Sequence, residues 1–150
     1  MPTINKIEKA ITIAAAPAQV WMCLTEPKLM GHWMGESEMK LKVRTDWTIG
    51  NPITISGFHH IKFQNTGRVL EFEPQKIIQY THLSSLSRLP ENVENHSVIS
   101  FVLTAQDENT LLTLYIERFP TETIMKHLDF YWQGTISVLK NFIEQIPEEG

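Results

Sequence analysis

Residues 20–33 read Val20-Trp21-Met22-Cys23-Leu24-Thr25-Glu26-Pro27-Lys28-Leu29-Met30-Gly31-His32-Trp33. The apolar side chains in this stretch recur at helical spacing. Pro17 and Pro27 each suit the first turn of a helix, where the missing N–H costs nothing. The stretch therefore predicts two short helices in succession, after a strand over residues 4–13.

A long helix is predicted at the end of the chain. It opens at Pro120-Thr121, runs to Ile146 and is closed by Pro147, which makes it roughly 39 Å long at 1.5 Å per residue. Its apolar residues recur every three or four positions and form one stripe, which must lie on a sheet. The stripe contains Ile124, Leu128, Trp132, Ile136, Leu139, Ile143 and Ile146, flanked by Met125, Tyr131 and Phe142.

Between these helices, residues 38–118 read as successive antiparallel strands. Alternation places Ile99, Phe101 and Leu103 on one inward face and Leu112, Leu114 and Ile116 on the matching face of the next strand. Residues 84–95 lack either period and are predicted to form a loop. Turns are predicted at Gly50-Asn51-Pro52, Gly57, Asn65-Thr66-Gly67, Glu73-Pro74-Gln75-Lys76 and Asp107-Glu108-Asn109.

This order of elements predicts a single α+β domain over residues 1–150, in which a curved sheet wraps the last helix and encloses a cavity. The net charge of −4 and the lack of a Lys/Arg cluster argue against a nucleic-acid partner. Cys23 is the only cysteine, so no internal disulfide can form. No apolar run approaches the ~18 residues of a membrane span, so we expect a cytoplasmic protein without stable membrane insertion.

Short motifs stand in a fixed order along nearly the whole chain. They are Val20-Trp21, Leu24-Thr25, Pro27, Leu29, Trp33, Gly50, Gly67-Arg68-Val69-Leu70-Glu71-Phe72-Glu73-Pro74, Ile78, Tyr80, Thr81, Thr110, Leu112, Leu114, Phe119 and Leu139-Lys140-Asn141-Phe142. Together they resemble the START-like, helix-grip (SRPBCC, Bet v allergen-type) superfamily. Within it, they are most similar to the branch named after activators of the heat-shock-protein-90 ATPase. The resemblance implies a helix-grip fold whose cavity lies between the sheet and the last helix.

The chain departs from this family pattern at two positions that bear on the cavity. The family often has a second tryptophan where this chain has Met34, and an aromatic residue where it has His82. We therefore expect an individual pocket lining. The co-chaperones that give the branch its name carry an additional N-terminal domain, for which a helix-grip unit filling 150 residues leaves no room.

The sequence offers no motif for a metal, a cofactor or nucleophilic catalysis. The six histidines form no HxxxH or HxH spacing with a carboxylate. Neither a GxSxG motif, nor a phosphate loop, nor a dinucleotide fingerprint is present. We expect no bound metal and no cofactor.

The candidate ligand-binding residues come from the inward strand faces and the apolar stripe. His82 shares a face with Ile78 and Tyr80, and is either a ligand contact or a hydrogen-bonded core residue. Arg118 continues the inward register of Ile116, and could pair with a ligand carboxylate or phenolate or with Glu71 or Glu117. The aromatic residues could equally be core packing. The full set is Trp33, Met34, Phe72, Tyr80, His82, Phe101, Ile116, Arg118, Met125, Leu128, Trp132 and Ile136.

The function expected from this pattern is binding of a small hydrophobic or amphipathic molecule, lipid-like or polyketide/aromatic-like, by a monomer or homodimer that is not an enzyme. One alternative is a polyketide-cyclase/aromatase-like enzyme. His82 would be its base, Arg118 would stabilise an enolate oxyanion, and Tyr80 and Glu71 would assist. The second alternative is an interaction module that regulates a chaperone partner.

Overall fold

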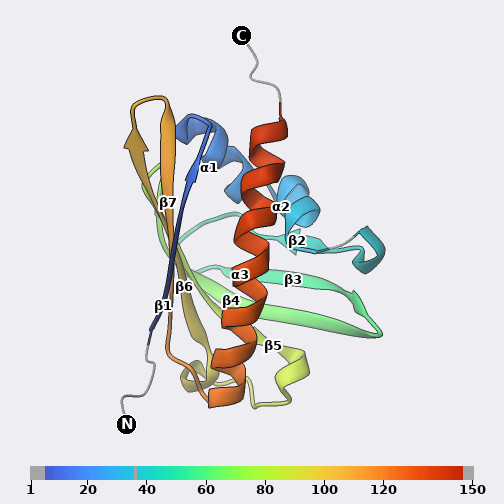
Figure 1. Cartoon of the computed structure of the whole chain (residues 1–150). Coiled ribbons are helices and arrows are strands. Elements are labelled where there is room, and N and C mark those ends of the chain that lie inside the picture. Colours follow the sequence, from blue (N-terminus) through green and yellow to red (C-terminus); the bar gives the residue numbers. More distant parts are fainter. Residues whose placement is uncertain (1–5, 36, 147–150) are drawn as a thin grey trace.

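The computed structural model describes residues 6–35 and 37–146. Its helices and strands follow the predicted order along the chain (Figure 1). They are β1 (Lys6–Ile13), α1 (Pro17–Thr25), α2 (Pro27–Trp33), η1 (Ser37–Met39), β2 (Lys42–Arg44), β3 (Pro52–His59), β4 (Ile61–Glu73), β5 (Ile77–Ser84), η2 (Ser85–Ser87), η3 (Val93–Asn95), β6 (Ser97–Gln106), β7 (Asn109–Glu117) and α3 (Glu122–Gln145).

The strands form one seven-stranded antiparallel sheet in the order β1-β7-β6-β5-β4-β3-β2. The sheet curves around α3, which crosses its inner face, and α1 and α2 lie beside the upper half of that helix (Figure 1). The predicted α+β helix-grip fold is confirmed.

Helix α3 begins and ends within one residue of its predicted bounds. The Thr121 hydroxyl caps it by accepting a hydrogen bond from the backbone N–H of Ile124 at 3.1 Å. The predicted stripe faces the sheet, and Leu139 and Ile143 are fully buried. Burial of this stripe, rather than helix propensity alone, stabilises so long a helix.

The two short helices each begin with the predicted proline. Hydrogen bonds from two indole N–H groups then hold α1 against α2 and against the segment that contains Trp47. Trp33 donates to the carbonyl of Cys23 at 2.9 Å, and Trp47 donates to the carbonyl of Thr25 at 2.7 Å. These bonds satisfy carbonyl groups at the end of α1, which its own helix leaves free.

Two of the predicted turns are wrong. Gly57 lies inside β3 and Gly67 lies inside β4, and the chain reverses instead at His60, whose φ is 64°. Gly67 is required because a Cβ there would lie 1.7 Å from the carbonyl oxygen of Thr81 in the neighbouring strand. This glycine therefore allows a close approach of two strands rather than a turn.

Side chains of α3 also reach the backbone at the end of the edge strand β1. The Lys140 ammonium donates to the carbonyl of Thr12 at 3.0 Å, and the Glu144 carboxylate accepts from the N–H of Ala14 at 2.8 Å. The hydrogen bond from Ala14, together with Lys140, holds the pKa of Glu144 below its ordinary value. The last helix is thus fixed to the first strand.

Candidate functional site

An aromatic layer lies between α3, α2 and strand β6. The ring of Trp132 lies 5.6 Å from that of Phe101, 6.2 Å from that of Trp33 and 5.1 Å from that of Tyr131, as centroid distances. The first three of these residues are almost completely buried. Edge-on and tilted packing of this kind adds about 0.5–1.5 kcal/mol per pair beyond the area that it buries.

A second aromatic group joins the short helices to the central strands. Phe72 lies 5.2 Å from Trp21 and 5.6 Å from Trp47, and Trp47 lies 6.3 Å from Tyr80. Unlike the first layer, this group contains residues that are only partly buried, namely Trp21, Trp47 and Phe72. It therefore lies where the core meets the surface.

All ten apolar or aromatic residues of the predicted site belong to one core cluster or pack against it. Met34, Ile116, Leu128 and Ile136 are buried and Met125 is half-buried. The structure therefore brings these residues together, as the strand alternation and the helix stripe predicted.

The predicted inward position of Arg118 is wrong. Strand β7 ends at Glu117, and Arg118 has a φ of 63° and an exposed side chain. The left-handed backbone breaks the alternation that extrapolation from Ile116 assumed. Glu71, the carboxylate of the enzyme hypothesis, is also exposed, because it pairs with Gln79 on the opposite face from Tyr80.

His82 does share the inner face with Ile78 and Tyr80, as predicted. Burial first, and then the neighbouring His96 and His127, lowers the pKa of His82 from 6.5 to about 4. Burial and the nearby Tyr131 raise the pKa of the Tyr80 phenol above its usual range. Both groups are therefore neutral at neutral pH.

Asn65 adds a third polar group to this inner face. It pairs with Ser84, two residues beyond His82 on the same side of β5, and its buried Oδ1 atom has no hydrogen-bond partner. Within the described chain, neither His82 nor the Tyr80 hydroxyl forms a hydrogen bond. We call these three residues, Asn65, Tyr80 and His82, the polar cluster.

Sequence reasoning missed Asn65 because it was assigned to a turn. Its inward position follows only from the pairing of β4 with β5, which keeps Asn65, Gly67 and Val69 on one face of a continuous strand. Tyr131, which flanks the predicted apolar stripe of α3, also faces this region. Its hydroxyl donates to the carbonyl of Met34, and burial raises its pKa to about 12.

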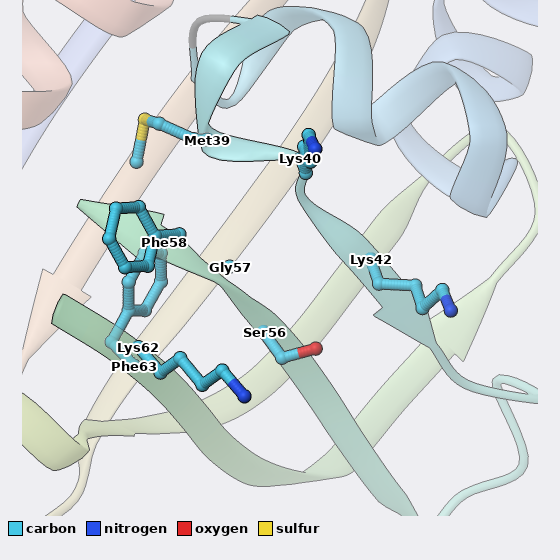
Figure 2. Close-up of a pocket in the computed structure, with 8 residues that line it drawn as sticks. All are labelled: Met39, Lys40, Lys42, Ser56, Gly57, Phe58, Lys62 and Phe63. Atoms are coloured by element: carbon cyan, nitrogen blue, oxygen red, sulfur yellow. The ribbon is translucent and has the colours of Figure 1, made fainter. Parts of the chain in front are cut away.

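A pocket of about 310 Å³ opens at the far end of the β3–β4 hairpin (Figure 2). Another, of about 340 Å³, lies beside Asp46, whose pKa is lowered by the N–H of Thr48 and the side chain of Asn51. Neither pocket contains a residue of the predicted site. The cavity expected between the sheet and α3 stays a prediction. The first pocket is lined by Met39, Lys40, Lys42, Ser56, Gly57, Phe58, Lys62 and Phe63.

Two further properties of the described residues bear on function. Over residues 6–35 and 37–146, no group of three or more His, Cys, Asp or Glu side chains is placed to hold a metal ion. None of the helices in the same ranges is long and apolar enough to cross a membrane.

The curved antiparallel sheet around a long C-terminal helix defines a helix-grip domain of the START-like class. Residues 14–144 match the sequence model of the family described as "Activator of Hsp90 ATPase homolog 1-like protein", and the chain belongs to this family. The resemblance drawn from the sequence is thereby confirmed. A search of curated proteins gave no significant match.

Solved structures with the same fold cover almost the whole chain. Protein CV1439 from Chromobacterium violaceum is 21% identical with a TM-score of 0.82, over 97% of this chain and 100% of that one. ChR145 from Cytophaga hutchinsonii is 28% identical with a TM-score of 0.77, over 96% and 97%. CalU16 from Micromonospora echinospora is 17% identical with a TM-score of 0.70, over 93% and 76%. The first and third likenesses show the fold alone.

Proposed function

We propose that this protein binds a small hydrophobic or amphipathic molecule between strands β4–β5 and the N-terminal half of α3. The observation that carries the proposal is the polar cluster. Asn65, Tyr80 and His82 face inward beside the aromatic layer and form no hydrogen bond to one another. Binding sites for small molecules combine an apolar lining with a few convergent polar groups in this way.

The energetics of the cluster favour a ligand with a polar group at one end. A buried polar atom without a partner costs about 1–3 kcal/mol, which a complementary ligand would recover. Because His82 and Tyr80 are neutral at neutral pH, they suit a carbonyl or hydroxyl group. The half-buried Phe72 and Met125 would contact the apolar remainder.

The enzyme alternative ranks behind binding. Arg118 and Glu71 both lie outside the inner face, so the cation that the enzyme hypothesis assigned to an enolate is not placed there. A histidine with a pKa of about 4 is also a weak general base at neutral pH. Chaperone regulation is supported by the family's description, but no residue of the polar cluster bears on it.

Native mass spectrometry of the gently purified protein, followed by organic extraction, tests the proposal. We expect a stoichiometric apolar passenger in the wild type. The passenger should be depleted in a Tyr80→Phe/His82→Phe variant, which removes the polar groups and keeps apolar bulk. Phe130→Ala, on the exposed face of α3, is the matched control and should retain the passenger.

An empty protein could also mean that the ligand is lost on purification. Titration with a panel of fatty acids and polycyclic phenols, followed by tryptophan fluorescence, covers that case, because Trp132 and Trp47 flank the site. If no panel member binds the wild type more tightly than the double variant, the proposal is wrong.

A further inference from the structure

The end of the β3–β4 hairpin carries a surface that the proposed ligand site does not use. Lys42 pairs with Ser56, and Phe58 pairs with Lys62, so their side chains share one face of the strands. Lys40 lies two residues before Lys42, and Ile61, which pairs with His59 beside the turn, lies on the opposite face of the hairpin tip from Phe58. We call Lys40, Lys42, Phe58, Ile61 and Lys62 the hairpin surface.

Among residues 6–35 and 37–146, no carboxylate forms an ion pair with the lysines of the hairpin surface, whereas Lys6, Lys9, Lys126 and Lys140 each form one. The chain as a whole has a net charge of −4, so this basic surface is local. An anionic partner is therefore attracted here and repelled by the rest of the molecule.

The tip of the same hairpin exposes large apolar side chains on both of its faces. Phe58 is 50% exposed and Ile61 is 59% exposed, although both lie on a regular hairpin. The hairpin extends away from α3 toward the periphery of the fold (Figure 1). In Figure 2 the ring of Phe58 lies below Met39, while Lys42 extends outward from β2 and Lys62 extends outward from β4.

We infer that the hairpin surface docks on membranes that contain anionic phospholipids. The lysine ammonium groups would pair with lipid phosphates, and Phe58 and Ile61 would enter the boundary between headgroups and acyl chains. A projecting tip with apolar side chains fits a planar lipid surface better than it fits the groove of a protein partner. The contact is peripheral and goes beyond the proposed function, since it places the ligand-binding domain at a membrane.

Co-sedimentation with lipid vesicles tests this inference. The wild type should bind vesicles of phosphatidylcholine mixed with an equal amount of phosphatidylglycerol, bind phosphatidylcholine alone poorly, and dissociate as salt is raised. Each lysine near an anionic surface strengthens binding about fivefold. A Lys40→Gln/Lys42→Gln/Lys62→Gln variant should therefore bind about 100-fold more weakly. Phe58→Ser/Ile61→Ser should also weaken binding.

Matched controls distinguish an effect of the hairpin surface from an effect of net charge or of exposed apolar side chains in general. A Lys28→Gln/Lys76→Gln/Lys126→Gln variant changes the net charge equally at exposed positions elsewhere. Val93→Ser/Phe130→Ser removes two other exposed apolar side chains. Both controls should bind like the wild type, and circular dichroism should show every variant folded.

A fluorescent label gives an independent readout. An environment-sensitive dye on Ile61→Cys should shift to the blue when anionic vesicles are added, and the same dye on Glu108→Cys, in the β6–β7 turn, should not. If the wild type fails to bind anionic vesicles, or binds them equally after loss of the three lysines, the inference is wrong. The assay needs no ligand in the interior, so its failure leaves the proposed function untouched.

Discussion

Gly67 in β4 and Thr81 in β5 approach so closely that a Cβ on the glycine would lie 1.7 Å from the carbonyl oxygen of Thr81 and 2.5 Å from its carbonyl carbon. The Thr81 hydroxyl also accepts a hydrogen bond from the N–H of Arg68 at 2.9 Å. Strand pairing shifts register a few residues further on, between Val69 and Glu71. The contact lies next to the polar cluster, so it fixes the part of the sheet that carries Asn65 and His82.

Gly67→Ala should therefore destabilise the protein by ~3 kcal/mol or more, because backbone rather than a mobile side chain must move to make room. Gly134→Ala is the matched control, since a Cβ there meets nothing within 4 Å and the residue lies in α3. That substitution should stabilise the protein by up to about 1 kcal/mol. Urea unfolding followed by circular dichroism measures both, and equal effects of the two alanines would contradict the contact.

The lowered pKa of His82 links stability to pH. Below pH 6.5 the unfolded chain binds a proton at this histidine that the folded chain does not bind until about pH 4. The free energy of unfolding should thus fall as the pH drops from 6.5 to 4, by about 3 kcal/mol at most. In His82→Gln this part of the pH dependence should disappear. If the free energy of unfolding depends on pH in the same way in both proteins, the His82 ring is protonated in the folded state as easily as in the unfolded chain.

Trp132 should contribute strongly to stability, because it is 3% exposed and meets three other aromatic rings. We expect Trp132→Ala to cost ~3–5 kcal/mol. The neighbouring Phe130 is 82% exposed, and Phe130→Ala should change the free energy of unfolding by less than about 0.5 kcal/mol. A small loss at Trp132 would show that the aromatic layer rearranges easily, as ligand entry requires.

Cys23 should be unreactive in the folded protein. It is fully buried, and burial raises the pKa of its thiol to about 11, so almost no thiolate exists at neutral pH. Iodoacetamide should label the cysteine only as denaturant unfolds the chain, in step with the loss of circular dichroism. Rapid labelling of the native protein would show that α1 opens independently of the core.

The sequence predicted the elements with strong periodicity well. Burial of the α3 stripe and of the faces of β6 and β7 follows from spacing alone, because each side chain's position is set by its own element. The wrong predictions concern residues whose position depends on a neighbouring element or on where a strand ends. Gly67 looks like a turn residue until the closeness of Thr81 is known, and Arg118 continues an alternation that ends one residue earlier.

The candidate site was predictable in its apolar part and, through Tyr80 and His82, in two of the three members of its polar cluster. Ten core residues were found because apolar periodicity marks them directly. Asn65 required the register of β4 against β5, which depends on long-range strand pairing. The hairpin surface was missed because its lysines are spread over β2, β4 and the residue after η1, and only folding brings them together.

The hydrogen bonds from α3 to the end of β1 affect how this protein behaves at high concentration. An open sheet has two edges whose free backbone groups can recruit a strand from another molecule, the first step of amyloid-like growth. Here Lys140 and Glu144 occupy backbone groups at the end of one edge strand, and the other edge, β2, is only three residues long and presents Lys42 and Arg44. Each edge of the curved sheet thus has a feature that hinders pairing with a strand of another molecule.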